Sequence, residues 1–227
     1  MRKRVISCLL VLAVIIGLVP TVQVDAKATK ITTGVELAAR MLDVAKNYKT
    51  IYVKGAWGWP CTDDNKPALI KKDPNRKDEI NSASEDTFAF DCVCLIKALF
   101  WGWDGDPTSK RGGAVYGSND VPDIGTETMI ARCSEVSTDF TDIEVGELVW
   151  MSGHVGIYVG NGLAVECTPK WKSCVQVTAC NKDVSGYNRR NWTKHGKLPY
   201  CEYTTPCTHS SRNTCGKCTD CGNIDLS

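Results

Sequence analysis

Apolar residues recur at helical spacing in two stretches of the chain. The first follows Thr33-Gly34-Val35-Glu36, a sequence typical of a capping box, in which the threonine hydroxyl and the glutamate carboxylate each accept a backbone N–H. Its apolar positions predict a helix that ends near Tyr48. The second stretch begins directly after the N-cap candidate Asp91. It places five apolar residues on one helical face: Cys92, Leu95, Ile96, Leu99 and Phe100.

The pattern changes to strands after Val145. Residues 154–159 alternate, and Gly160-Asn161-Gly162 after them is a hairpin signal. Helices followed by an antiparallel β-meander predict the α+β class, with Cys92 at a helix N-terminus that packs on the meander. Further strands are predicted at 148–151, 163–168 and 175–178, loops at 61–87 and 104–122, and a short helix over about 123–133.

The two ends of the chain differ from its middle in composition. Residues 1–26 have the features of an export signal: the basic run Arg2-Lys3-Arg4, an apolar run, and the small-x-small site Val24-Asp25-Ala26. The apolar run is shorter than the roughly 20 residues that span a bilayer, so we predict cleavage near Ala26 and no stable membrane span afterwards. Residues 27–200 then form one domain and residues 201–227 a Cys-rich tail. The expected location is extracellular or cell-wall associated, in a bacterium.

Charge and cysteine usage narrow the function further. The chain has 27 basic and 26 acidic residues, a net charge of +1, which gives no reason to expect a nucleic-acid partner. All but one of the 13 cysteines follow the predicted signal, and in an exported protein disulfides are their expected use. The spacing Cys215-x-x-Cys218-x-x-Cys221 also suits a thiolate metal site, but disulfides are the preferred interpretation. We expect no metal, no cofactor and a monomer.

Cys92 is the candidate nucleophile. A thiol in the first turn of a helix lies in the partial positive charge of the helix N-terminus, which favours the thiolate, and backbone N–H groups there can serve an oxyanion. His154 starts a strand and is the candidate base, since a Cys–His pair is activated by proton transfer from thiol to imidazole. The other two histidines, His195 and His209, lie in polar surroundings. The alternatives are that Cys92 is a buried or disulfide-bonded cysteine and that His154 is structural.

The hairpin register supplies a third group. If Gly160-Asn161-Gly162 is a three-residue loop, Val159 pairs with Leu163 and Glu166 lies on the same face as His154, diagonally adjacent. A two-residue turn would move Glu166 to the aliphatic face, where a buried carboxylate is costly. We therefore assign Glu166 to orienting the imidazole. The alternative is an exposed strand acid.

These residues resemble a known family. The segment 90–96 (FDCVCLI) is similar to the D-C-S-G-L-V nucleophile motif of the NlpC-type cell-wall cysteine peptidases, 146–150 (GELVW) to their G-D-L-V-F strand, and 154–160 (HVGIYVG) to their H-V-G-I-Y-L-G strand. The segment 51–56 (IYVKGA) resembles their Y-x-W-G-G motif, whose tyrosine helps to hold the reacting carbonyl. The motifs occur in the family's order over about residues 51–170.

The resemblance implies a papain-like α+β fold, related to that of the CHAP amidases, and hydrolysis of amide bonds in peptidoglycan stem peptides. Cys92, His154 and Glu166 are then the catalytic residues, and Tyr52 and Asp91 the candidate substrate and oxyanion residues. The chain departs from the family at Cys94, where the family has Gly, at Glu166, where His is usual, and at Lys54, where an aromatic is usual. The rival interpretations are a non-catalytic wall-binding module on this scaffold and a disulfide-rich secreted protein. Trp57, Trp59, Trp101, Trp103 and Trp171 are candidates for either a binding groove or the core.

Overall fold

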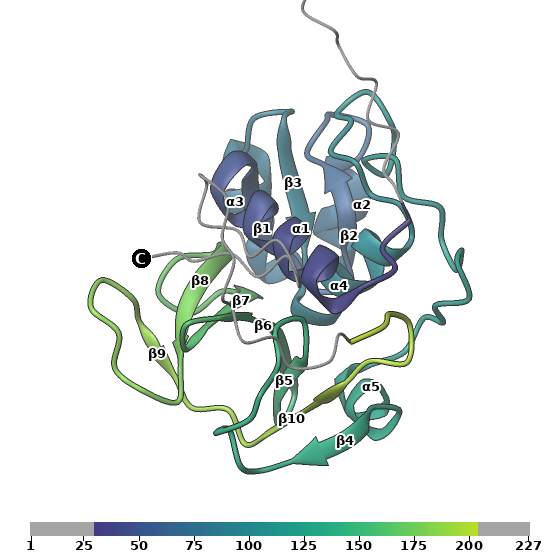
Figure 1. Ribbon diagram of the computed structural model, residues 1–227. Coiled ribbons are helices and arrows are strands. Elements are labelled where there is room, and N and C mark those ends of the chain that lie inside the picture. Colours follow the sequence, from purple (N-terminus) through teal and green to yellow (C-terminus); the bar gives the residue numbers. More distant parts are fainter. Residues whose placement is uncertain (1–29, 204–227) are drawn as a thin grey trace, which may run out of the picture.

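The computed structural model describes residues 30–203 (Figure 1). The predicted export signal and residues 204–227 of the predicted tail lie outside the described residues. Residues up to 203 belong to the folded unit: Glu202 bridges to Thr33, its N–H donates to Thr32 O at 2.8 Å, and its own carbonyl accepts the Gly34 N–H at 2.9 Å. The folded part therefore runs past the boundary predicted at residue 200.

A seven-stranded sheet forms the larger half of the molecule, in the order β4-β10-β5-β6-β7-β8-β9. Strands β5 to β8 are consecutive, neighbouring and antiparallel, so the predicted β-meander is confirmed. Only the β8–β9 pair of this sheet is parallel. The strands are β4 (Ser134–Ser137), β5 (Leu148–Met151), β6 (His154–Gly160), β7 (Leu163–Thr168), β8 (Cys174–Cys180), β9 (Arg189–Arg190) and β10 (Lys194–Lys197).

The β6–β7 hairpin has the predicted register but a different turn. Ile157 pairs with Val165, as the three-residue loop required, whereas at the tip Gly160 pairs with Leu163 across a β-bulge. The turn is therefore the two residues Asn161 and Gly162, both with positive φ (53° and 73°), as a type I′ turn requires. The bulge absorbs the extra residue, which is why the shorter turn leaves the faces of both strands unchanged.

Two helices cover one face of this sheet (Figure 1). Helix α1 (Gly34–Asn47) starts with the predicted capping box: Thr33 Oγ1 accepts the Glu36 N–H at 3.2 Å and Glu36 Oε2 accepts the Thr33 N–H at 3.1 Å. Helix α4 (Cys92–Phe100) packs on β6 and β7. All its residues are buried, even Lys97, which pairs with Asp123. The helix is therefore central, rather than amphipathic as its pattern suggested.

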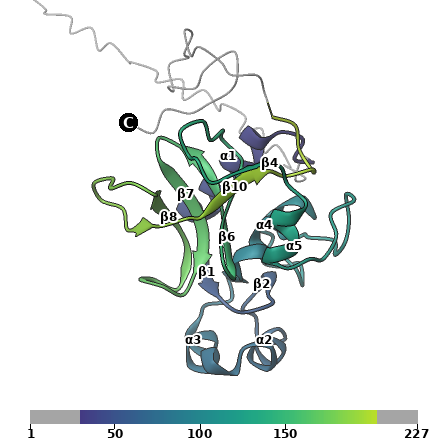
Figure 2. The same cartoon turned by 90° about the horizontal axis from the view of Figure 1, so that it is seen from below.

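A smaller unit lies beside the sheet. It contains helices within residues 61–87, so the loop predicted there was wrong. It consists of β1 (Lys49–Tyr52), β2 (Trp57–Pro60) and β3 (Thr87–Phe90) in the order β1-β3-β2, with α2 (Lys66–Lys72), the 3-10 helix η1 (Pro74–Arg76) and α3 (Lys77–Ser82) at the far end (Figure 2). Among residues 66–82, only Leu69 and Ile80 are buried, and both enter a separate small core. Such short helices with one apolar anchor each show no periodicity to detect.

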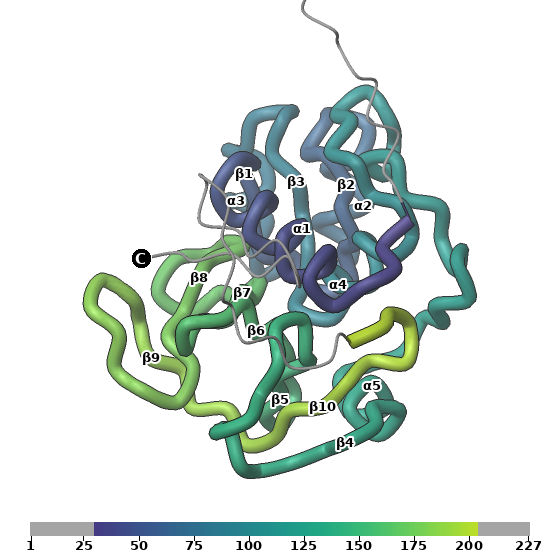
Figure 3. Tube along the Cα trace, viewed as in Figure 1, coloured from purple at the N-terminus to yellow at the C-terminus, as the bar shows by residue number. Residues whose placement is uncertain are grey.

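The chain returns late to complete the large sheet. Strand β10, near the yellow end of the trace, inserts between β4 and β5 (Figure 3). Helix α5 (Thr126–Ala131) lies within the predicted 123–133 segment. No helix within residues 30–203 is long and apolar enough to cross a membrane. The described part has the predicted α+β class, with Cys92 at the start of a helix that packs on the meander.

Candidate active site

Cys92 is the first residue of α4, where the chain leaves β3. Asp91 holds this junction: its Oδ1 accepts the Cys94 N–H at 2.7 Å and its Oδ2 accepts the Gly55 N–H at 2.7 Å. One carboxylate thus caps α4 and ties it to the loop between β1 and β2. Both oxygens of Asp91 thus bind backbone donors at the junction that holds Cys92. The substrate or oxyanion contact expected from the sequence stays a prediction.

The Cys92 thiol is buried, with 6% of the residue exposed. Burial raises the pKa of Cys92 to about 12, the Asp91 charge adds to the rise, and the N–H groups of Val155 and Val93 act in the opposite direction. Desolvation therefore outweighs the helix N-terminus that was expected to favour the thiolate. Helix α4, which begins at Cys92, packs on β6, the strand that begins at His154.

His154 is the first residue of β6, and its imidazole meets Glu166 of β7. The two side chains join through a hydrogen bond of 2.6 Å between His154 Nε2 and Glu166 Oε2. The His154 side chain is 15% exposed, whereas that of Glu166 is fully buried. The hairpin register derived from sequence thus brings together the predicted base and its predicted partner.

Glu166 has more partners than sequence reasoning supplied. Arg190 of β9 donates from Nη2 to Oε2 at 2.6 Å and from Nε to Oε1 at 3.0 Å, and Thr178 of β8 donates to Oε1 at 2.8 Å. Burial disfavours the charged carboxylate, but the hydrogen bonds from His154 and Arg190 outweigh it, so the pKa of Glu166 is lowered. Glu166 is therefore an ionised, fully hydrogen-bonded group.

Two contacts fix the His154 imidazole: the hydrogen bond at Nε2 and an aromatic ring stacked on its face. The Trp192 ring stacks on His154 with centroids 5.5 Å apart and an interplanar angle of 6°. Because Nε2 is bonded to Glu166, Nδ1 is the nitrogen left to exchange a proton with a nucleophile. The geometry suits a base that is held from one side and acts on the other.

Tyr52, at the end of β1, lies close to this centre. Burial raises the pKa of the Tyr52 hydroxyl, and the neighbouring Cys92 and Asp91 add to the rise. Arg76 lies over the ring, 5.7 Å from its centroid, and the Tyr52 N–H donates to Ser173 Oγ at 3.3 Å. The hydroxyl consequently stays protonated and can donate a hydrogen bond near the Cys92 sulfur.

The cysteines within residues 30–203 are all free thiols, which corrects the expected disulfides there. Most are buried in helices and strands as small apolar residues. Cys215, Cys218 and Cys221, the predicted metal or disulfide cluster, lie outside the described residues. In the described part, no group of three or more His, Cys, Asp or Glu side chains is arranged to hold a metal ion.

His195 is buried, contrary to the polar surroundings inferred from sequence. Its Nδ1 pairs with the buried Glu147, and its Nε2 contacts Asp139 O at 2.6 Å. Since both ring nitrogens are engaged, this second His–carboxylate pair is structural, so among the histidines within residues 30–203 His154 stays the candidate base.

The five tryptophans considered from the sequence differ in burial. Trp59, Trp101 and Trp103 are buried core residues, whereas Trp57 is half-buried and Trp171 is 42% exposed. Trp171 stacks on Arg190, whose guanidinium carbon is 4.7 Å from its ring centroid. Arg190, Thr178 and Trp192 are the site residues that sequence reasoning missed.

Comparison with known proteins adds little to this geometry. No family model matches the chain, and no curated protein does so either. Among solved structures, the chain is similar to NlpC2 from Trichomonas vaginalis, with 15% identity and a TM-score of 0.40 over 78% of this chain and 50% of that one. It is also similar to NlpC1 from the same organism, with 16% identity and a TM-score of 0.35 over 73% and 44%. The chain spans half or less of the length of these proteins, and at such similarity its function has to be judged from the site itself.

Proposed function

We propose that this chain is a secreted, papain-like cysteine hydrolase that cleaves amide bonds in peptidoglycan stem peptides, with Cys92 as nucleophile, His154 as base and Glu166 as the group that orients the base. The observation that carries the proposal is the part-buried 2.6 Å hydrogen bond between His154 and Glu166, on the two strands against which the helix that begins at Cys92 packs. The order of the sequence motifs supports the substrate class, and the predicted export signal supports the location.

The reaction follows from the placement of these groups. His154 Nδ1 accepts the thiol proton as the Cys92 sulfur attacks the substrate carbonyl, and the Glu166 carboxylate stabilises the imidazolium that forms. In this proposal, the Cys92 backbone N–H and the Tyr52 hydroxyl donate to the developing oxyanion. His154 then protonates the leaving amine, and water hydrolyses the thioester. None of these steps requires a cofactor.

The test is digestion of purified sacculi by the full chain, followed by mass analysis of the released peptides. We expect fragments from the wild type and none from Cys92→Ala or His154→Ala. Cys61→Ala is the matched control, because Cys61 is an equally buried thiol in the separate small core, with a pKa that burial raises to about 12. Equal release by Cys92→Ala and the wild type contradicts the proposal.

A wall-binding module without catalysis is the second candidate, and the raised pKa of Cys92 favours it. It predicts that the chain sediments with sacculi and releases no peptide. Release of peptides that depends on Cys92 excludes this candidate.

A further inference from the structure

The Arg190 guanidinium lies beside Glu166 and offsets the negative charge that this carboxylate presents to His154. Arg190 is nearly as buried as its partner, with a 10% exposed side chain against 0% for Glu166. Besides its bonds to both carboxylate oxygens, its Nη2 donates to Thr168 Oγ1 at 3.1 Å. A buried guanidinium this close to a carboxylate offsets most of its charge, and it cannot be deprotonated.

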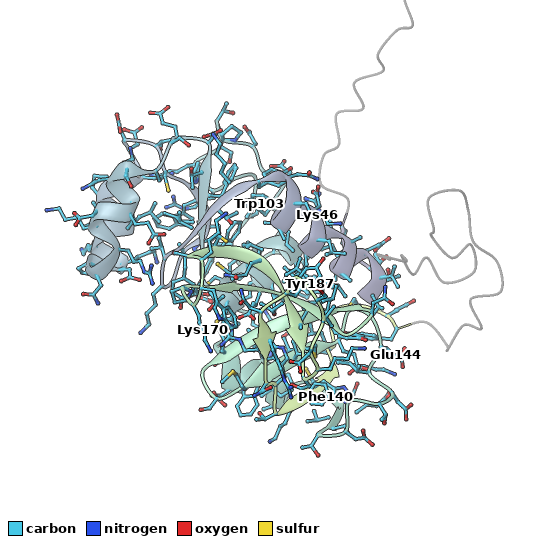
Figure 4. The ribbon with its side chains drawn as sticks, turned by 90° about the vertical axis from the view of Figure 1, so that its left-hand side faces the viewer. Lys46, Trp103, Phe140, Glu144, Lys170 and Tyr187 are labelled. Atoms are coloured by element: carbon cyan, nitrogen blue, oxygen red, sulfur yellow. The ribbon has the colours of Figure 1, made fainter. Side chains whose placement is uncertain are left out.

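Arg190 is also held in place by aromatic rings. Its guanidinium carbon lies 4.7 Å from the Trp171 ring centroid and 5.9 Å from that of Trp192, the ring that stacks on His154. Lys170 contacts the same Trp171 ring at 4.6 Å. Figure 4 labels Lys170, which lies in the β7–β8 loop, and Tyr187, which lies in the β8–β9 loop. The rings limit the access of water to the ion pair, so the charges remain coupled.

We propose that Arg190 is a positioning residue that neutralises Glu166, so that Cys92 keeps its proton in the resting site and His154 acts as a general base only during attack. This inference rests on the proposed function. A lone carboxylate on His154 Nε2 would instead stabilise a resting thiolate–imidazolium pair.

Two influences on the Cys92 thiol support the same resting state, while the carboxylate of Glu127, near His154, is exposed to solvent that screens its charge. Asp91 disfavours a thiolate at the neighbouring Cys92, and burial acts in the same direction. Glu127 of α5 accepts the Gly153 N–H at 3.0 Å, directly before the histidine. The titratable and charged groups that face the Cys92–His154 centre are Glu166, Arg190, Asp91, Glu127, Cys167 and Tyr52.

The bonds, proton and electrons of the attack step are all accounted for by groups of the site and the substrate. The S–H bond of Cys92 breaks as the C–S bond to the substrate carbonyl forms, the proton moves to His154 Nδ1, and the carbonyl π electrons move to oxygen. In the resting site, sulfur and imidazole are both neutral. Proton transfer and attack therefore belong to the same step, as in a serine hydrolase.

The experiment is an NMR titration of the His154 imidazole in the full chain without substrate, with the signal assigned by its loss in His154→Ala. We expect Arg190→Met to raise the His154 pKa by at least about one unit, a tenfold change in protonation. Arg190→Lys, which retains the cation, is expected to titrate like the wild type. Arg189→Met is the matched control, because Arg189 is the exposed neighbour on the same strand. An unchanged His154 titration in folded Arg190→Met overturns the proposal.

A second pair of variants covers the case in which Arg190→Met does not fold. Glu166→Gln and Glu166→Gln/Arg190→Met both lack the buried carboxylate and differ only in the cation. We expect the higher His154 pKa in the double variant, and equal values overturn the inference. Because both titrations are made without substrate, they are independent of the sacculus digestion that tests the proposed function.

Discussion

Replacing Asp91 with Asn should destabilise the fold and, at the same time, make the Cys92 thiol more reactive. Asp91 stabilises the start of α4 through both oxygens, but its charge also raises the pKa of the Cys92 thiol. Asn keeps the size and one acceptor and loses the charge, so its amide group must face one of the two N–H donors. An unsatisfied, partly buried N–H costs about 1–3 kcal/mol, so we expect the free energy of unfolding to fall by that amount.

The effect on the thiol follows from Coulomb's law. Two charges about 5–7 Å apart at an effective dielectric of about 20 interact by about 2–3 kcal/mol, or about two pKa units. A thiol pKa lowered by that amount raises the thiolate fraction at pH 8 about 100-fold. Thiolates of lower pKa are weaker nucleophiles, with a Brønsted slope of about 0.4–0.5, which reduces the net gain in alkylation rate to about tenfold.

The assay is iodoacetamide labelling at pH 8 with peptide mapping, alongside urea denaturation. Asp63→Asn, which changes an exposed acid in the 61–65 segment, is expected to alter neither quantity. Labelling of Cys61 and Cys180 reports on unfolding, because both thiols are buried away from Asp91. If Cys92 in Asp91→Asn reacts no faster than in the wild type, or if the control thiols accelerate equally, the electrostatic reasoning is wrong.

Three further outcomes test the fold and its pH dependence. His195→Gln should lower the free energy of unfolding by about 3–5 kcal/mol, because it removes one partner of the buried pair with Glu147, while Cys92 labelling in the folded protein stays unchanged. Urea denaturation should show Gly146→Ala to be far more destabilising than Gly186→Ala. Both glycines have positive φ, where alanine costs about 1–2 kcal/mol of strain. Only at position 146 does the added Cβ also approach a backbone carbonyl oxygen, that of Gly34, to 2.2 Å. The folded pKa of Glu166 lies below its ordinary value of 4.5, so its contribution is present above about pH 4.5 and is lost as pH falls through the lower folded-state value. Urea midpoints between pH 6 and 3 should therefore fall more steeply in the wild type than in Glu166→Gln, and equal slopes contradict this.

The parts of the site that could be predicted are those that depend on neighbours in sequence. The capping box of α1 and the N-cap of α4 are decided within four residues, and the meander by alternation and turn residues. Glu166 could be placed next to His154 because a hairpin connects them and its period of two determines which side chains share a face. Even with the wrong turn length, the aliphatic pattern predicted the right register, since a slip would have moved the Glu166 carboxylate away from His154 and in among aliphatic side chains.

The remaining parts depend on contacts between distant segments. Arg190 reaches Glu166 because the two-residue strand β9 pairs parallel to β8, and no local pattern marks so short a strand. The pKa of Cys92 could not be judged because burial, not the helix N-terminus, dominates it, and the amount of burial follows from how α4 packs. His195 was missed for the same reason: its polar neighbours in sequence are not its neighbours in space.

The packing of α4 also determines what Cys94 can do. Residues two apart on a helix point about 200° apart, so the Cys94 side chain lies on the side opposite to that of Cys92. The surroundings agree with this geometry: Lys97 and Asp123 influence the Cys94 thiol, whereas the N–H of Val155 influences Cys92. A disulfide between the two cysteines would require α4 to unwind at its first turn and to lose the cap that Asp91 provides. The Cys94 thiol is thus a core residue, and in our proposal the reactivity of Cys92 is controlled by Asp91 and the Glu166–Arg190 pair.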